Sequence, residues 1–226
     1  SGDFARYMKA TTSNMYSRAM QFASSGLSVM PCGLDKKPLL KSWKQYQTTP
    51  ATDEEIEAWW QKWPNANIGI ITGKVSGITV IDVDSYRGGK AEQFPRTFSV
   101  KTGNGGVHLY FKYHPGITIS ANAYKDMPGI YLRGDGGFVI APYSVTNYSD
   151  PSTHEHKGGE YTIINDVPPV DFPSALFPKV KVQRKLSTLI GVGSGQRNDS
   201  LASFIGKLLK MSDEKDWEKE VWPAVE

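Results

Sequence analysis

Apolar residues recur at helical spacing in two segments near the start of the chain. A first helix is predicted over residues 14–25, where apolar side chains return every three or four positions, and it should end at Gly26. A second helix is predicted to begin at Thr52 and to run to about residue 64. Thr52 and Glu55 have the spacing of a capping box, which favours a helix start at this point.

A β-rich pattern of short apolar runs separated by glycine turns follows the helices. Strands are predicted at residues 27–31, 68–72, 78–84, 97–102, 107–113, 130–133, 138–141 and 160–164. These elements predict an α/β domain in which a mixed, mainly antiparallel sheet forms a cleft and helices pack outside it.

The composition allows a large core and gives a domain division. Of 226 residues, 39% are hydrophobic, and proline-rich residues 168–178 predict that a main domain over 1–178 closes there. Residues 179–226 are predicted to be a basic linker and the start of a helical module of a longer protein. No apolar stretch approaches the roughly 20 residues that span a bilayer, so a cytoplasmic location without a membrane partner is expected.

Residues that could build a zinc site are sparse. Cys32 is the only cysteine, which excludes an internal disulfide and a cysteine-rich zinc module. His154 and His156 lie in a predicted polar turn at residues 149–159, where a solvated role is favoured over metal binding. The net charge of +3 permits nucleic-acid binding without arguing for it.

The run at residues 78–84 carries the first candidate chemistry. Asp82 and Asp84 alternate with Ile81 and Val83, so both carboxylates should point to one face of the strand. A divalent metal ion or a shared proton would relieve their repulsion. Two solvated acids at a strand end are the alternative.

A glycine-rich turn and an arginine hairpin are the second and third motifs with candidate chemistry. Lys101, Thr102 and His108 flank a turn with three glycines, whose amides can bind an anion such as phosphate; a simple tight hairpin is the alternative. Arg133 shares a predicted strand face with Tyr131 and would clamp a phosphate or carboxylate, or else form a surface salt bridge. The turn lacks the spacing of a P-loop or a Rossmann fingerprint.

Taken in order, the three motifs are more specific than any one alone. Asp82-x-Asp84, Thr102-Gly-x-Gly-Gly-x-His108 and Arg133-Gly-Asp-Gly-Gly-Phe-Val-Ile-Ala-Pro-x-Ser resemble the bifunctional primase-polymerase domain of the archaeo-eukaryotic primase superfamily. The resemblance covers about residues 16–177, and the later Gly-Gln-Arg-Asn run at 195–198 is similar to the helical module that often follows this domain. It implies the archaeo-eukaryotic primase fold.

The resemblance implies a DNA primase-polymerase that makes and extends primers on single-stranded DNA from ribo- or deoxyribonucleoside triphosphates, often beside a helicase part. Catalysis would depend on Asp82, Asp84 and His108, with Mg²⁺ or Mn²⁺ on the two aspartates. The implied nucleotide-binding residues are Lys101, Thr102, Asn104, Gly105, Gly106, His108 and Arg133. Two further segments, Lys-Lys-Pro at 36–38 and Trp43-Lys44, also resemble the family. The lysines in and near them are candidates for template contacts: Lys36, Lys37, Lys41 and Lys44.

One departure from the family pattern bears on activity. Tyr131 stands where the family usually has a third metal-binding aspartate, and a phenol with a pKa near 10 does not replace a carboxylate at neutral pH. Asp135 or Asp126 would then supply the third ligand, with Asp135 favoured, or two carboxylates and water suffice. A weakened replication-initiation module that binds single-stranded DNA, and a metal-dependent nuclease or phosphatase, stay open as alternatives.

Overall fold

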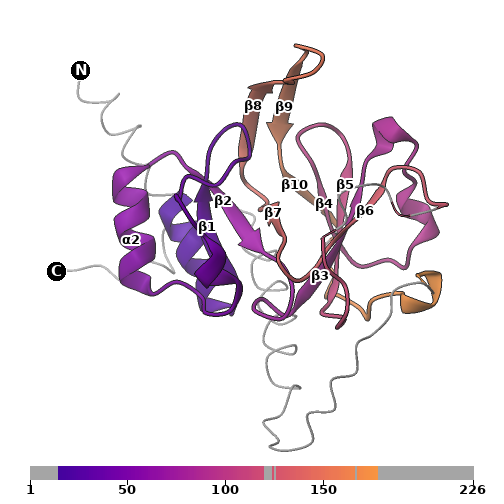
Figure 1. Cartoon of the computed structure of the whole chain (residues 1–226), viewed down its shortest axis with the longest axis horizontal. Helices are drawn as coiled ribbons and strands as arrows, with labels where there is room; N and C mark the ends of the chain where they lie inside the picture. Colours follow the sequence, from indigo (N-terminus) through magenta and orange to yellow (C-terminus); the bar gives the residue numbers. More distant parts are fainter. Residues whose placement is uncertain (1–14, 120–123, 125, 166, 178–226) are drawn as a thin grey trace, which may run out of the picture.

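The computed structural model describes residues 15–119, 124, 126–165 and 167–177, and its strands form three sheets (Figure 1). The strands are β1 (Ser28–Cys32), β2 (Asn67–Ile71), β3 (Ile78–Val83), β4 (Phe98–Lys101), β5 (Val107–Lys112), β6 (Ile130–Arg133), β7 (Phe138–Ile140), β8 (Val145–Ser149), β9 (His156–Glu160) and β10 (Thr162–Asn165). Their orders are β1-β2-β7, β10-β4-β5-β3-β6 and β8-β9. Every pairing among these strands is antiparallel.

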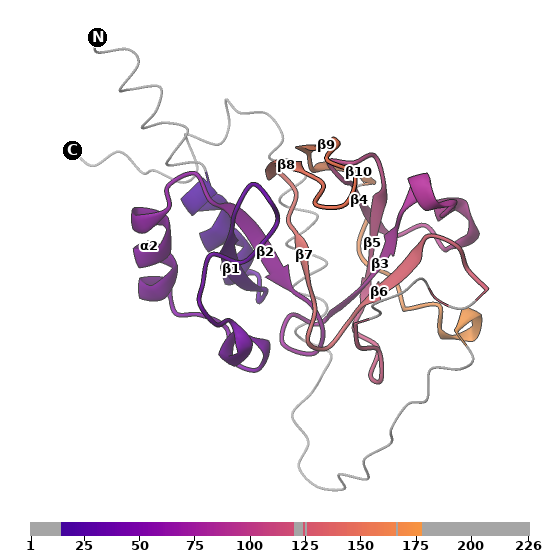
Figure 2. The same ribbon diagram turned by 45° about the horizontal axis from the view of Figure 1, so that its top comes forward.

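Two helices cover the three-stranded sheet on the side away from the five-stranded sheet, as both views show (Figures 1 and 2). One occupies residues 15–24, and the other is α2 (Asp53–Lys62). The predicted capping box is present, because the Glu55 amide donates to Thr52 Oγ1 at 3.2 Å and the Thr52 amide donates to Glu55 Oε2 at 2.9 Å. Four short 3-10 turns complete the helical structure of the described residues: η1 (Lys44–Gln47), η2 (Ser85–Arg87), η3 (Ala91–Gln93) and η4 (Ser174–Leu176).

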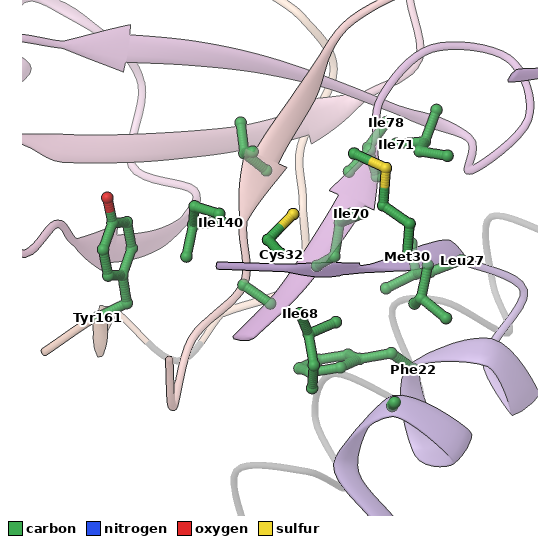
Figure 3. Packing of buried hydrophobic residues seen from close by; sticks show 14 of the residues in the cluster. Phe22, Leu27, Met30, Cys32, Ile68, Ile70, Ile71, Ile78, Ile140 and Tyr161 are labelled. Atoms are coloured by element: carbon green, nitrogen blue, oxygen red, sulfur yellow. The ribbon is translucent and has the colours of Figure 1, made fainter. Parts of the chain in front are cut away.

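The larger core cluster extends from the two helices through the three-stranded sheet to one face of the five-stranded sheet. Figure 3 shows Phe22 of the first helix packed against Ile68 of β2, within the cluster that also contains Val80 and Tyr110 from the five-stranded sheet. Alternate residues on the opposite face of the five-stranded sheet, such as Ile81, enter a second cluster closed by the segment before η4. The period of two therefore gives the five-stranded sheet two apolar faces.

The chain passes between the sheets at two short connections, residues 72–77 and 134–137. They lie side by side, since Thr72 Oγ1 donates to the Gly134 carbonyl at 2.6 Å and the Thr72 amide donates to the Gly137 carbonyl at 2.9 Å. A side chain at Gly134 would place its Cβ within 2.2 Å of the Ile117 carbonyl oxygen, so glycine is required there. These connections fix where the two sheets meet.

The predicted α/β fold with mainly antiparallel strands is confirmed. The structure differs in dividing the strands among three sheets where one had been expected, and in forming the hairpin of β8 and β9 where a polar turn had been predicted at residues 149–159. The helical module predicted at residues 179–226 lies outside the described residues. Within the described part of the chain, no helix is both long and apolar enough to cross a membrane.

Candidate active site

A cleft of about 500 Å³ opens between the five-stranded and three-stranded sheets. One wall carries polar and charged residues: Asp82, Asp84, Arg87, His108 and Arg133 come from β3, β5, β6 and the turn after β3, and Lys36 from the loop after β1. The other wall carries apolar residues from β7 and two loops: Trp43, Ile119, Phe138, Val139 and Ile140. Five charged side chains and one histidine thus converge on one cavity.

Asp82 lies at the centre of the charged wall because β3 runs between β5 and β6. In the strand register it is directly opposite His108 on one side and Tyr131 on the other. Its Oδ1 lies 3.5 Å from His108 Nε2, and its Oδ2 accepts a hydrogen bond from Arg133 Nη2 at 3.4 Å. The predicted alternation is confirmed, because Ile81 and Val83 enter the core cluster on the opposite face.

The pKa of Asp82 is lower than that of an ordinary aspartate. Burial is the largest single influence and raises it, but His108, Arg133 and Lys36 together outweigh burial and lower it. The side chain is one quarter exposed, at 25%. Asp82 therefore faces the cleft as a carboxylate.

Asp84 follows the end of β3 and is held by the next turn. Its Oδ2 lies 3.3 Å from Arg87 Nε, and Arg87 Nη1 in turn donates to the Tyr131 hydroxyl at 3.0 Å. The side chain of Arg87 is 66% exposed, so this pair is open to solvent. Tyr131 thus supports a cation beside Asp84 and adds no carboxylate to the site.

His108 is buried in the wall of the cleft, at 6% exposure. Its ring centroid lies 5.9 Å from that of Tyr161, while Nδ1 is buried with no hydrogen-bond partner among the described residues. An unpaired buried nitrogen beside a carboxylate is unusual in a purely structural histidine. This observation favours a functional role.

The glycine turn between β4 and β5 brings only part of the predicted nucleotide-binding set into the cleft. Thr102, Asn104 and Gly106 line it, whereas Lys101 and Gly105 do not. The Asn104 side chain is already engaged, because Nδ2 donates to the Tyr148 hydroxyl at 2.8 Å and Oδ1 accepts from the Gly158 amide at 2.9 Å. Asn104 therefore fixes the β8–β9 hairpin over the turn.

Only one of the four candidate template lysines lines the cleft. Lys36 lines the cleft with its backbone in the left-handed region, at φ 68°, and its Nζ lies 4.6 Å from the Tyr148 ring centroid. Lys37, Lys41 and Lys44 are exposed outside the cleft. Lys36 is thus a site residue, and the other three belong to the surrounding surface.

Neither candidate for a third metal ligand lies with Asp82 and Asp84. The Asp135 carboxylate accepts from the Lys74 amide at 2.9 Å and from the Tyr113 hydroxyl at 3.0 Å, and it lines a different cavity. Burial and this hydrogen bond raise the pKa of Tyr113 to about 12. Asp126 is exposed in a turn outside the cleft. The two turns lie at opposite ends of β6, that of Asp126 before the strand and that of Asp135 after it.

The donor set nevertheless fits Mg²⁺ or Mn²⁺. Asp82 and Asp84 supply two hard oxygen ligands, and Mg²⁺ typically binds one or two carboxylates together with water and substrate phosphates. Within the described residues, no group of three or more histidine, cysteine, aspartate or glutamate side chains is placed to hold a metal alone. His154 and His156 belong to no such group.

The sequence reasoning did not assign Arg87, Tyr161 or Phe138 to the site. Arg87 could have been found, since it follows Asp84 by three residues within a turn. Tyr161 and Phe138 reach the cleft from β-structure far along the chain, and only the packing of the sheets brings them there.

Residues 19–175 match the family described as bifunctional DNA primase/polymerase, N-terminal, which is more than half of the chain. The chain therefore belongs to this family of primase/polymerase domains, whose members generally depend on divalent metal ions. No curated protein matches the chain.

Proposed function

We propose that this protein is a DNA primase-polymerase that makes and extends primers on single-stranded DNA by template-directed nucleotidyl transfer. The observation that carries the proposal is the arrangement around Asp82: this carboxylate on β3 and that of Asp84 just after the strand line one cleft, with His108 and Arg133 on the neighbouring strands. The family assignment makes DNA and nucleotides the expected substrates.

The charge of the cleft suits a triphosphate. Lys36, Arg87 and Arg133 supply three positive charges beside the two carboxylates, so the described side chains already favour a polyanion. A divalent ion on Asp82 and Asp84 would neutralise charge that develops on the phosphates during transfer. Two groups of opposite sign, the carboxylates and the cations, thus have separate tasks in one cavity.

The residues of the cleft then divide the reaction between them. A primer 3′-oxygen forms a bond to the α-phosphorus, and the bond to pyrophosphate breaks. Arg133 and Lys36 would hold the phosphates in line, and His108, fixed through Asp82, would contact a phosphate oxygen.

The template and the cellular setting complete the proposal. Exposed Lys37, Lys41 and Lys44 would contact the template backbone beside the cleft. The protein would act in the cytoplasm, either associated with the nucleoid or encoded by a mobile element. A helicase part would belong to the same chain or to a partner chain. Either ribo- or deoxyribonucleotides would serve as substrates.

A second candidate is a weakened module that binds single-stranded DNA without synthesis. It is favoured by the contacts of Asp84, whose carboxylate is paired with Arg87, while Arg87 also donates to the Tyr131 hydroxyl on the neighbouring strand β6. An arginine on this carboxylate competes with a metal ion for the same oxygen atoms.

A primer-synthesis assay separates the two. The protein is incubated with a single-stranded template, labelled nucleoside triphosphates and Mg²⁺ or Mn²⁺. Product from wild type that is lost in Asp82→Asn and Asp84→Asn supports the primase-polymerase. Asp171→Asn is the matched control, because Asp171 is 92% exposed and lies outside the cleft. Template binding without product under either metal refutes the first proposal and supports the second.

A further inference from the structure

The apolar wall of the cleft has no task in the chemistry proposed above. Trp43 and Phe138 are partly buried, and Ile119 is 50% exposed, yet all three line the same cavity as the catalytic carboxylates. Partly exposed aromatic side chains that face a polar cavity typically mark a binding surface.

Two of these residues form a defined aromatic pair. The ring centroids of Trp43 and Phe138 lie 5.4 Å apart with an interplanar angle of 76°, an edge-to-face contact. Phe138 is on β7, an edge strand of the three-stranded sheet, and Trp43 directly precedes η1. Two separate elements thus hold the aromatic surface in place.

The two walls together specify the chemistry of the ligand. The carboxylates, Arg87 and Arg133 belong to the five-stranded sheet and the turn after β3, and Lys36 adds a cation from the loop after β1. The aromatic pair belongs to β7 and the loop before η1. A ligand that contacts both walls needs a polyanionic end and a flat apolar end. The cavity of about 500 Å³ is in the size range of small-molecule sites.

We infer that Trp43 and Phe138 form the base-binding subsite of a nucleoside triphosphate whose phosphates lie beside Arg133. The inference rests on the proposed function, because it concerns the substrate of the same cleft. The side chains of this wall offer aromatic and aliphatic surface and, apart from the indole N–H, no hydrogen-bonding group. The subsite should therefore accept every base and bind purines more tightly than pyrimidines, since purines stack over a larger area.

Competition binding with a fluorescent nucleotide tests the inference without requiring synthesis. Affinities for ATP and for inorganic tripolyphosphate are measured in Mg²⁺ for wild type, Trp43→Leu, Trp43→Phe and Phe138→Leu. Trp63→Leu is the matched control, because Trp63 is also a partly buried tryptophan packed on the larger core but does not line the cleft. Thermal melting of each variant confirms that it is folded.

We expect Trp43→Leu to weaken ATP binding about tenfold, as loss of one stacking contact does, and to leave tripolyphosphate binding unchanged. Trp43→Phe should retain most of the affinity, Phe138→Leu should weaken ATP binding alone, and Trp63→Leu should match wild type. Arg133→Ala should weaken both ligands.

Three results would overturn the inference: wild type that binds ATP no more tightly than tripolyphosphate, Trp43→Leu that weakens both ligands equally, or Trp43→Leu that weakens neither. Failure of the two proposals is distinguishable. A protein that makes no primer but shows Trp43-dependent ATP binding refutes the primase-polymerase and keeps the subsite. Synthesis with Trp43-independent ATP binding refutes the subsite alone.

Discussion

Replacing Gly106 by alanine should damage the active site through the backbone. A Cβ at this position would lie 2.5 Å from the Val83 carbonyl oxygen, where ordinary contact begins at 3.4 Å. The neighbour is backbone, so it cannot rotate away, and one of the two strands must move by about 0.9 Å. Val83 directly precedes Asp84, so the shift is transmitted to a candidate metal ligand.

The expected effect on stability is smaller than the expected effect on the reaction rate. Overpacking of a well-packed site typically costs about 1–3 kcal/mol of unfolding free energy, which the domain should tolerate. A shift of about 1 Å at a reacting group can lower a rate about 100-fold. Gly106→Ala should therefore remain folded and lose most of the DNA synthesis that we propose for the wild type.

Gly105→Ala in the same turn is the control. A Cβ there meets nothing within 4 Å, but the backbone is left-handed at φ 82°, so alanine is strained by about 1 kcal/mol without displacing β3. Primer-extension rates and urea melts are measured for both variants. If Gly106→Ala kept the wild-type rate, or if both variants lost activity in proportion to stability, the steric argument would be refuted.

Three further predictions concern other sites. Tyr131→Asp places a third carboxylate opposite Asp82 in the β3–β6 register, so the variant should bind Mn²⁺ at least about tenfold more tightly in calorimetry. Tyr131→Phe should not change Mn²⁺ affinity, and equal affinities of the two variants would contradict the register argument. The pKa of Asp150 lies far below the ordinary value of about 3.9. The largest cause is a hydrogen bond from Lys157, followed by hydrogen bonds from Ser152 and Thr153 in the same turn. This stabilisation is complete above about pH 4 and declines as the pH falls toward the lowered pKa of the folded protein. Asp150→Asn should therefore lower the melting temperature more at pH 7 than at pH 2, and a constant difference would disagree. Burial, and to a smaller extent the nearby Asp35, raise the pKa of the Cys32 thiol to about 12. Iodoacetamide should therefore label Cys32 at pH 8 only in urea, and rapid labelling of the folded protein would contradict its burial.

The parts of the site that follow from local periodicity could be predicted from sequence. The alternation of Asp82 with Ile81, and of His108 with Leu109, determines which side chains share a strand face, and the structure confirms both. The capping box at Thr52 is a similar case, because its partners are three residues apart.

The parts that depend on packing between distant segments could not be predicted. Strand β9 contains His156 and the glycines 158 and 159 and shows no apolar alternation, so only its pairing with β8 makes it a strand. The division into two larger sheets depends on the bonds between the two connections, which no local pattern reveals. The sequence favours Asp135 as a metal ligand because it lies in the turn that follows residues 130–133, yet its partners Lys74 and Tyr113 come from other turns.

The position of Asp135 affects how mutational data on this domain should be interpreted. Its carboxylate joins the connection after β6 to the connection after β2 through the Lys74 amide. An Asp135→Ala variant would alter the spacing of the walls of the cleft and could lose activity without losing a metal ligand. An inactive variant in an alanine scan would then resemble a catalytic mutant, and only unchanged metal affinity at Asp82 and Asp84 would show that geometry had been lost while the ligands remained.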